Sequence, residues 1–168
     1  LDVNEVIFET ETPNLHLIPA GINLAAAEVE LINRFRREDV LKTNVTEKVR
    51  DNYDFVIIDC LPSLGLLTIN ALTAADTVLV PVQCEYFALE GLTKLQNTIE
   101  RVQAQLNPEL KIEGILLSMY DQRLRLANMV VEKVREIFGE KVFDTIIHRN
   151  ARISEAPNMH LPVAMILS

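Results

Sequence analysis

Asp59 is the residue of this chain whose position best suits a metal ion. It closes the apolar run "FVIID" at residues 55–59, and "CLPSLG" follows directly. A carboxylate at the carboxyl end of a buried strand emerges where the ligands of open α/β sheets bind. Because Mg²⁺ keeps most of its waters, one carboxylate is enough to hold its water shell. The alternative is that Asp59 only forms the turn after the strand.

The segment after Asp59 also allows two interpretations. Pro62 and Gly65 mark a sharp turn, and Ser63 can cap the helix that follows. The segment is either an ordinary strand-to-helix turn or a switch that senses a terminal phosphate. A phosphate-binding loop of the form GxxxxGK[ST] is absent, because none of the five glycines is followed by lysine. Little therefore remains in this chain to hold a triphosphate.

Four arginines form a second candidate site. Arg123 and Arg125 follow one predicted strand in "DQRLRL", and Arg149 and Arg152 follow another in "HRNARISEAP". If both loops lie at the same edge of a sheet, the four cations form a patch that contacts phosphate oxygens. The alternative is a set of ordinary solvated arginines.

Five short apolar runs predict the strands that position these residues: 15–19, 55–59, 77–82, 112–119 and 142–147. Most are near-continuous, which is typical of strands covered on both faces of a parallel sheet. Helical patterns lie between them, at 24–35, 45–52, 64–75, 86–106 and 127–138. Within the fourth pattern, Tyr86, Phe87 and Leu89 are expected at the buried start of a core helix, and a surface for a protein partner is the alternative. This order predicts a doubly wound, mostly parallel α/β sheet in a single domain over residues 1–168.

The composition limits the classes of function. The net charge of −8 disfavours broad nonspecific attraction to nucleic acid but allows a local basic patch. Cys60 and Cys84 lie in apolar stretches, which indicates reduced thiols in a cytoplasmic protein. No apolar run approaches the ~20 residues of a membrane span.

Three segments resemble the ParA/Soj family of chromosome and plasmid partition ATPases, which are related to MinD: "YDFVIIDCLPSLGLLTINALTAADTVLVPVQCEYFALEGL", "LNPELKIEGILLSMYD" and "RNARISEAP". The likeness runs from about residue 15 to residue 157. It implies a fold of the P-loop NTPase type, with ATP and Mg²⁺ as cofactors and a homodimer that forms on ATP binding. It also implies nonspecific DNA binding at the nucleoid and a ParB-type partner that stimulates hydrolysis.

The resemblance assigns roles to individual residues. Asp59 matches the Walker B aspartate, which holds Mg²⁺ through water, and Pro62 and Ser63 match the switch segment. Arg149 and Asn150 match the segment that lines the nucleotide base. Among the four arginines of the proposed patch, Arg123 and Arg152 match arginines that contact DNA, while Arg125 belongs to the patch by its place in the loop.

The sequence departs from the family pattern in three places. The phosphate loop lies in a first third of the family that this chain lacks, so we expect a sheet without its first strands and with unpaired edges. The family's "DCPPS" reads "DCLPS" here, and "IPRN" reads "IHRN", with His148 beside the base. Both ends look cut, and we do not expect this chain to hydrolyse ATP by itself.

Two alternatives to a partition ATPase remain open. The first is a truncated, non-enzymatic module that binds DNA or a protein partner. The second is a membrane-associated positioning ATPase similar to MinD, which would need an amphipathic C-terminal helix with a basic face. The final segment "LPVAMILS" has no basic residue, and this disfavours the membrane alternative.

Overall fold

The computed structural model describes residues 2–21, 23–60, 65–159, 162–163 and 165. The strands are β1 (Phe8–Glu9), β2 (His16–Leu17), β3 (Thr77–Gln83), β4 (Lys111–Tyr120) and β5 (Val142–His148). The α-helices are α1 (Leu24–Leu31), α2 (Glu47–Val49), α3 (Leu66–Ala74), α4 (Ala88–Gln105), α5 (Arg125–Phe138) and α6 (Ala151–Met159). Short 3-10 turns cover Val3–Val6, Arg37–Asp39, Arg50–Asn52 and Gly139–Lys141, and Lys42–Thr46 is a π-helical turn.

The chain divides into two compact units. The first comprises Leu1–Asp76 with Thr98–Leu110, and the second comprises Thr77–Asn97 with Lys111–Ser168. Helix α4 begins in the second unit and ends in the first. Each unit has its own sheet, which is β1-β2 in the first unit and β3-β4-β5 in the second.

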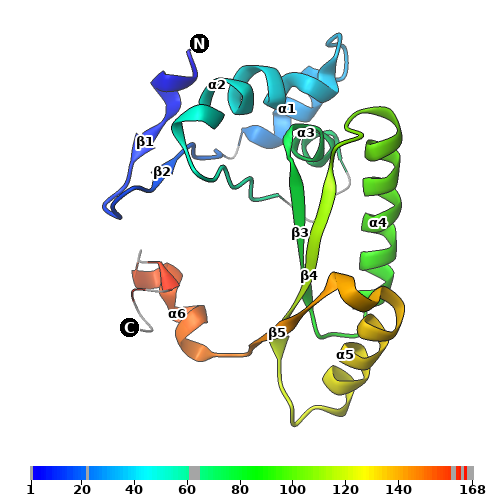
Figure 1. The fold of residues 1–168 in the computed structure, drawn as a ribbon. Helices are drawn as coiled ribbons and strands as arrows, with labels where there is room; N and C mark the ends of the chain where they lie inside the picture. The colour runs from blue at the N-terminus through cyan, green and yellow to red at the C-terminus, as the bar shows by residue number, and fades with distance from the viewer. Residues whose placement is uncertain (1, 22, 61–64, 160–161, 164, 166–168) are drawn as a thin grey trace. The chain divides into compact units, whose positions relative to one another are not determined.

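The second unit is built on a parallel sheet with the strand order β3-β4-β5 (Figure 1). Strands β3 and β4 pair from Thr77 opposite Lys111 to Gln83 opposite Ser118. Strand β5 pairs with β4 on its other side. The three strands lie where the apolar runs predicted them, and the mixed α/β fold with a parallel sheet is confirmed. Because the strands are parallel, the residues that follow them leave the sheet at one edge.

Helices α4 and α5 cover one face of this sheet, and the core of the second unit lies between them and the strands (Figure 1). Leu117 of β4 and Val134 of α5 are fully buried there, and Leu92 of α4 joins them. The apolar stripe of α4 follows the helical period because one face of the helix packs against the sheet. Helix α5 ends at Gly139, whose positive φ of 52° suits glycine at a helix C-terminus.

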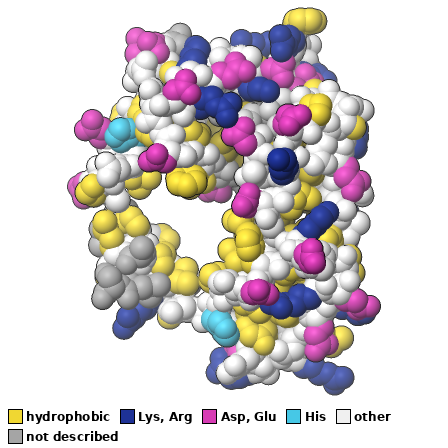
Figure 2. Space-filling view, viewed as in Figure 1, with side chains coloured by type: hydrophobic (Ala, Val, Ile, Leu, Met, Phe, Trp, Pro, Cys, Tyr) yellow, Lys and Arg dark blue, Asp and Glu magenta, His cyan; other side chains and the backbone are white. Residues whose placement is uncertain are grey.

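The prediction that the strands are covered on both faces is wrong for β3. Val80 and Val82 are buried, whereas Leu79 and Pro81, which alternate with them, are exposed. Alternate residues of a strand point to opposite faces, and the helices that contribute to this core cover one face only. Hydrophobic side chains therefore reach the molecular surface beside charged ones (Figure 2).

The first unit contains a short antiparallel hairpin rather than parallel strands. Strands β1 and β2 pair with Phe8 opposite Leu17 and Glu9 opposite His16. The predicted strand at 15–19 is therefore present only as β2, in a different sheet. The predicted strand at 55–59 is wrong: residues 55–60 form no strand, and Ile57 is 90% exposed. Its backbone pairs with none of the described strands, and an apolar run without a ladder partner cannot form a sheet.

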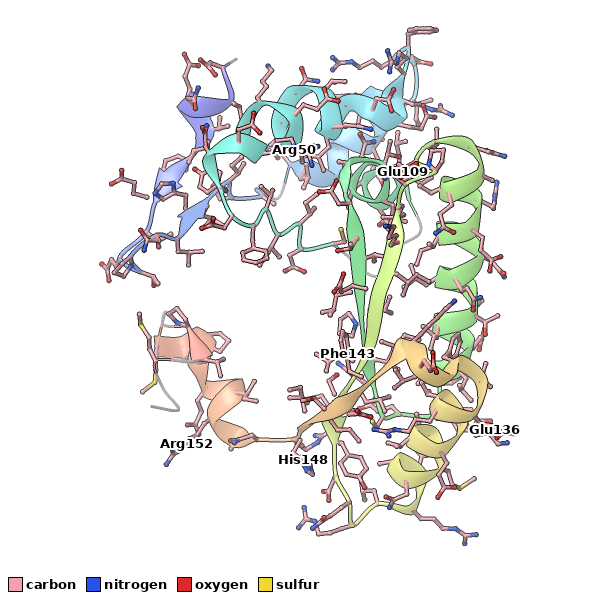
Figure 3. All side chains as sticks on the ribbon, in the orientation of Figure 1. Arg50, Glu109, Glu136, Phe143, His148 and Arg152 are labelled. Carbon is pink, nitrogen blue, oxygen red and sulfur yellow. The ribbon has the colours of Figure 1, made fainter. Side chains whose placement is uncertain are left out.

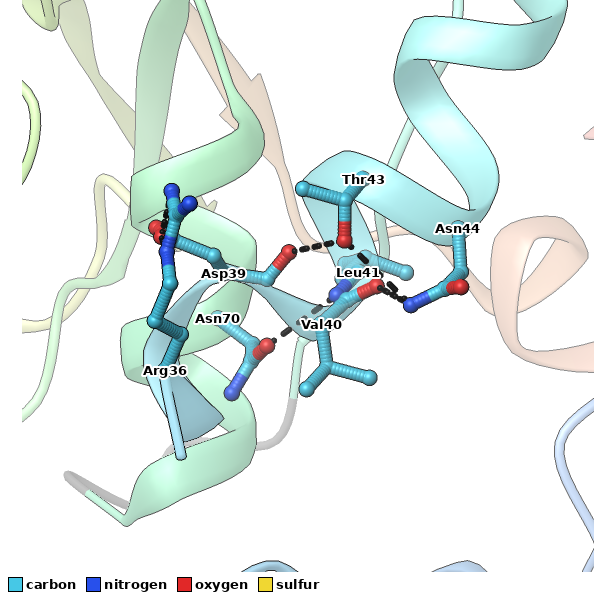
Figure 4. A network of polar contacts seen from close by, with 7 residues as sticks. All are labelled: Arg36, Asp39, Val40, Leu41, Thr43, Asn44 and Asn70. Carbon is cyan, nitrogen blue, oxygen red and sulfur yellow. Dashed lines mark hydrogen bonds and ion pairs between the residues drawn. The ribbon is translucent and has the colours of Figure 1, made fainter. Parts of the chain in front are cut away.

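A buried asparagine of α3 organises the polar interior of the first unit (Figure 4). The amide oxygen of Asn70 accepts from the backbone N–H of Leu41 at 3.1 Å. Its Nδ2 donates to the carbonyl oxygens of Arg37 at 2.8 Å and Leu66 at 3.0 Å. A buried amide is stable only when its polar atoms have partners. Asn70 therefore fixes the turn at residues 37–41 against α3.

Candidate phosphate-binding site

The loops that follow β4 and β5 meet at the carboxyl edge of the parallel sheet. The backbone N–H of Arg149 donates to the carbonyl oxygen of Tyr120 at 2.9 Å. Tyr120 also pairs with His148 across β4 and β5, and their rings make an edge contact with centroids 5.1 Å apart. The loops after β4 and β5 therefore begin side by side. These are the two loops whose arginines were predicted to form a patch.

The backbone at the end of β4 is irregular where it approaches the loop after β5. Met119 has a φ of +53°, and the register between β4 and β5 shifts between Leu117 and Tyr120. Such irregularities bend a strand and redirect the side chains beyond them. Here the hydroxyl of Tyr120 donates to Oδ1 of Asn128 on α5 at 2.6 Å.

Asn128 also holds the loop that carries Arg123. Its Nδ2 donates to the carbonyl oxygens of Gln122 and Leu124, each at 3.0 Å. One side chain of α5 therefore fixes both the tyrosine that ends β4 and the loop that follows it. The sequence analysis did not identify Asn128, because a single asparagine in a helical pattern carries no signal of such a role.

Arg123 forms a two-point ion pair with Asp121. Its Nε donates to Asp121 Oδ1 at 2.9 Å, and its Nη2 donates to Oδ2 at 2.7 Å. The backbone N–H of Arg123 also donates to Asp121 Oδ1, at 3.0 Å. The side-chain hydrogen bond from Arg123 is the main cause that lowers the pKa of Asp121 to about 2, and the backbone hydrogen bond adds to it. Asp121 in turn raises the pKa of Arg123.

Arg149 makes a longer ionic contact, with a glutamate in the loop that follows β3. Its Nη2 lies 3.6 Å from Oε1 of Glu85, which comes two residues after the end of β3. The charge of Arg149 also contributes to the lowered pKa of Asp121. Loops from all three parallel strands thus bring charged side chains to the same edge.

Six residues line a depression of about 200 Å³ at this edge: Tyr120, Asp121, Gln122, Arg123, His148 and Arg149. Two guanidinium groups and an imidazole around one depression can accept a phosphate-type oxyanion, since Arg donates in a fork that matches phosphate oxygens. The structure therefore brings Arg123 and Arg149 together, and their contact with phosphate stays a prediction.

The other predicted residues of the patch lie apart from this depression. Arg125 is the first residue of α5, and Arg152 lies on α6 (Figure 3). Neither lines the depression. Asn150 caps the start of α6, because its Oδ1 accepts from the backbone N–H of Arg152 at 2.9 Å. Helix α6 was not predicted from the sequence.

An exposed aromatic pair follows β3 at the same carboxyl edge. Tyr86 is 74% exposed and Phe87 is 72% exposed, and their rings make an edge contact with centroids 5.1 Å apart. The prediction of a buried helix start is wrong for both rings, because α4 begins at Ala88 and they lie outside its packed stripe. It holds for Leu89, which is partly buried against the core.

Asp59 lies in the first unit, at the exposed end of the segment at residues 53–60. Pro62 and Ser63, which were predicted to form the switch, lie outside the described residues. Burial and then the nearby charge of Asp59 raise the pKa of the Cys60 thiol. Among the residues that the structure describes, no three of His, Cys, Asp and Glu gather to hold a metal ion. Asp59 alone fits only a contact with Mg²⁺ through its water shell.

Glu28 on α1 binds the start of helix α3. Its Oε1 accepts from the backbone N–H of Leu67 at 3.2 Å. A Cβ on Gly65 would lie only 2.3 Å from the same oxygen. A carboxylate at a helix N-terminus satisfies free N–H groups and complements the helix dipole. Glu28 was not predicted, because its partner lies 39 residues away in the sequence.

Comparison with known proteins identifies relatives over nearly the whole chain. Residues 1–112 match the family model of an AAA domain. The chain is 54% identical over 164 residues to the sporulation initiation inhibitor protein Soj of Bacillus subtilis, and 53% identical over 162 residues to the chromosome-partitioning ATPase Soj of Treponema pallidum. These alignments cover 98% and 96% of this chain and 64% of each relative. The chain therefore spans less than two thirds of the length of these relatives.

A solved structure confirms the fold class. The cobyrinic acid a,c-diamide synthase from Mycobacterium smegmatis, with bound ADP and magnesium, superimposes with a TM-score of 0.81 and 34% identity. The match covers 96% of this chain and 70% of that chain.

The parallel sheet, with helices packed on it and polar loops at its carboxyl edge, defines an α/β protein of the P-loop NTPase fold class. Within that class, the chain belongs to the AAA domain family, and it is homologous over nearly its whole length to the Soj and ParA chromosome-partitioning proteins. Among the described residues, no helix is both long enough and apolar enough to cross a membrane.

Proposed function

We propose that this chain serves ParA-type DNA segregation and contributes DNA-binding arginines to it. The identity of 54% to a Soj protein over nearly the whole chain supports this function. In this proposal the protein acts in the cytoplasm at the nucleoid, dimerises when ATP binds, and responds to a ParB-type partner. ATP hydrolysis belongs to the complete ATPase, since this chain has no GxxxxGK[ST] loop.

The observation that carries the proposal is the meeting of the β4 and β5 loops. The hydrogen bond from Arg149 N–H to Tyr120 O places Arg149 beside the loop of Arg123. Two arginines on one depression can contact neighbouring phosphates of DNA without reading its sequence. Arg152 and Arg125 would extend the contact to phosphates farther along the duplex.

Asp59 would serve the Mg²⁺ ion of a bound nucleotide. Bound Mg²⁺ neutralises the charge of the terminal phosphates. Asp59 would hold the water shell of this ion through its exposed carboxylate. Asn150, in the loop after β5, would line a nucleotide base, whereas Arg149 is assigned to the phosphates of DNA. Thermal unfolding tests this part: ATP and Mg²⁺ at 100 times their Kd should stabilise the chain by ~2.7 kcal/mol, and Asp59→Asn should reduce the gain with Mg²⁺ present.

The DNA function is tested by the salt dependence of binding. We would measure the affinity of the chain for a labelled duplex of random sequence between low and moderate salt, with and without ATP and Mg²⁺. The double variant Arg123→Gln/Arg149→Gln should make the slope of log K against log salt shallower by about 1.8, since each phosphate contact contributes about 0.9.

The matched control removes the same charge elsewhere. The double variant Arg34→Gln/Arg101→Gln changes exposed arginines of the first unit, and it should leave the slope close to that of the wild type. Equal slopes for the wild type and both double variants would reject the assignment of Arg123 and Arg149 as the arginine site that binds DNA. No binding of the wild type under any condition would reject DNA binding by this chain.

A further inference from the structure

We propose that Asp121 and Glu85 are built-in competitors of phosphate, which occupy the guanidinium groups of Arg123 and Arg149 until a nucleic-acid backbone displaces them. They would thus set the affinity of the site. This inference rests on the proposed function, because it concerns the same two arginines. The ligand class is a chain of phosphodiesters, since the site offers separate guanidinium groups rather than a single closed cradle.

Asp121 binds Arg123 through the same two donors that a phosphate would use. Both Nε and Nη2 of Arg123 already donate to one carboxylate, at 2.9 and 2.7 Å. An Arg fork binds two oxygens of a phosphate through the same two donors. A phosphate and Asp121 therefore cannot use this face of the guanidinium at the same time.

The carboxylate is fixed in place while the guanidinium remains accessible. The Asp121 side chain is only 14% exposed, whereas that of Arg123 is 83% exposed. An incoming phosphate can therefore approach Arg123 from solvent. Asp121 keeps its bond to the backbone N–H of Arg123 after the guanidinium has turned away.

The two competitors differ in strength. Glu85 holds Arg149 through one contact at 3.6 Å, and both side chains are more than half exposed. Exposed single contacts of this kind are weak. Arg149 should accept phosphate first, and Arg123 should follow when the local phosphate concentration is high enough to displace Asp121.

The loop does not depend on the charge of Asp121 for its conformation. Asn128 holds the carbonyl oxygens of Gln122 and Leu124 from α5. In an Asp121→Asn variant, the remaining amide oxygen can still accept from the backbone N–H of Arg123. This substitution therefore removes the competing charge and leaves the loop in place.

The test is duplex DNA binding by Asp121→Asn, with Glu113→Gln as the matched control. Both substitutions change the net charge by one, but Glu113 is an exposed residue near the opposite end of β4. We expect Asp121→Asn to bind about two- to fivefold more tightly than the control, which is the range of an exposed ion pair. The gain should disappear when Arg123→Gln is present in both proteins. Equal affinity of Asp121→Asn and Glu113→Gln, or a gain that persists without Arg123, would overturn the inference.

A DNA-free measurement separates the two possible failures. The Nε–H resonance of Arg123 should shift in Asp121→Asn and stay in place in Glu113→Gln. If it does not shift, the pair does not exist in solution, and the inference fails whatever the protein binds. If it shifts but neither the wild type nor Asp121→Asn binds DNA, the DNA function proposed above fails, and competition for DNA fails with it.

Discussion

The segments 55–60 and 142–150 share one sequence pattern but have different structures. Each begins with an apolar run and continues with polar residues that were predicted to bind a ligand. Residues 142–148 form β5 on the edge of a parallel sheet, and Arg149 is anchored to Tyr120. Residues 55–60 form no strand, and Ile57 is 90% exposed.

The difference shows that a strand needs a neighbour as well as the right residues. Strand β5 has the backbone of β4 beside it, whereas no described strand pairs with residues 55–60. Unpaired backbone groups and exposed apolar side chains leave such a segment without the contacts that define its register. The arginine site is therefore held by specific contacts, and Asp59 is not.

The largest expected effect contrasts two apolar residues, one in each region. Leu117 of β4 is fully buried at 0% exposure, so Leu117→Ala should lower the free energy of unfolding by about 2–5 kcal/mol. Ile57→Ala should change it by less than about 0.5 kcal/mol, as is usual for an exposed side chain. Chemical denaturation of both variants measures the difference. A large loss for Ile57→Ala would show that residues 55–60 pack in solution.

A glycine substitution tests the close packing of β4 against β5. Phe143 lies on β5 (Figure 3). A Cβ on Gly114 would lie 2.4 Å from its ring, which must then move. Gly114→Ala should therefore destabilise the chain by about 1–3 kcal/mol. Gly91→Ala is the control: nothing lies within 4 Å of its added methyl group, and alanine in the interior of α4 should stabilise by about 0.5–1 kcal/mol. If both variants behave alike in thermal unfolding, the packing of Phe143 on Gly114 is refuted.

The smallest effect concerns the titration of Asp121. Its pKa is lowered from 3.8 to about 2, so the ion pair stabilises the fold above pH 3.8, and this contribution is lost as the pH falls through about 2. Arg123→Gln should raise the pKa of Asp121 toward 3.8. Carbon-detected NMR of the carboxyl group checks this, and an unchanged pKa in Arg123→Gln would mean that the arginine is not its main partner.

The sequence predicted the second unit well, because its signals are local or periodic. The runs at 77–82, 112–119 and 142–147 each became a strand, and the apolar stripe of residues 86–106 became α4. The hairpin β1-β2 and the unpaired segment at 55–60 were not predicted. Both depend on which backbone lies alongside, and a single run of residues does not contain that information.

The sequence predicted the arginines of the candidate site. It did not predict the residues that hold these arginines and their loops in place. The positions of Arg123 and Arg149 directly after strands indicated a common edge. Asp121 could have been recognised, since an aspartate two residues before an arginine commonly accepts from the following backbone. Glu85 and Asn128 reach the site from β3 and α5, and only the tertiary structure brings them there.

The most direct test of the account is an NMR titration of the ¹⁵N-labelled chain with a short duplex DNA at low salt. We predict that amide shifts change at residues 119–123 and 148–152, where the contacts from β4, β5 and α5 hold the arginine site. Residues 55–60 should change little. Shift changes confined to residues 55–60, or an unmoved loop at 120–123 in a chain that binds the duplex, would contradict the central claim.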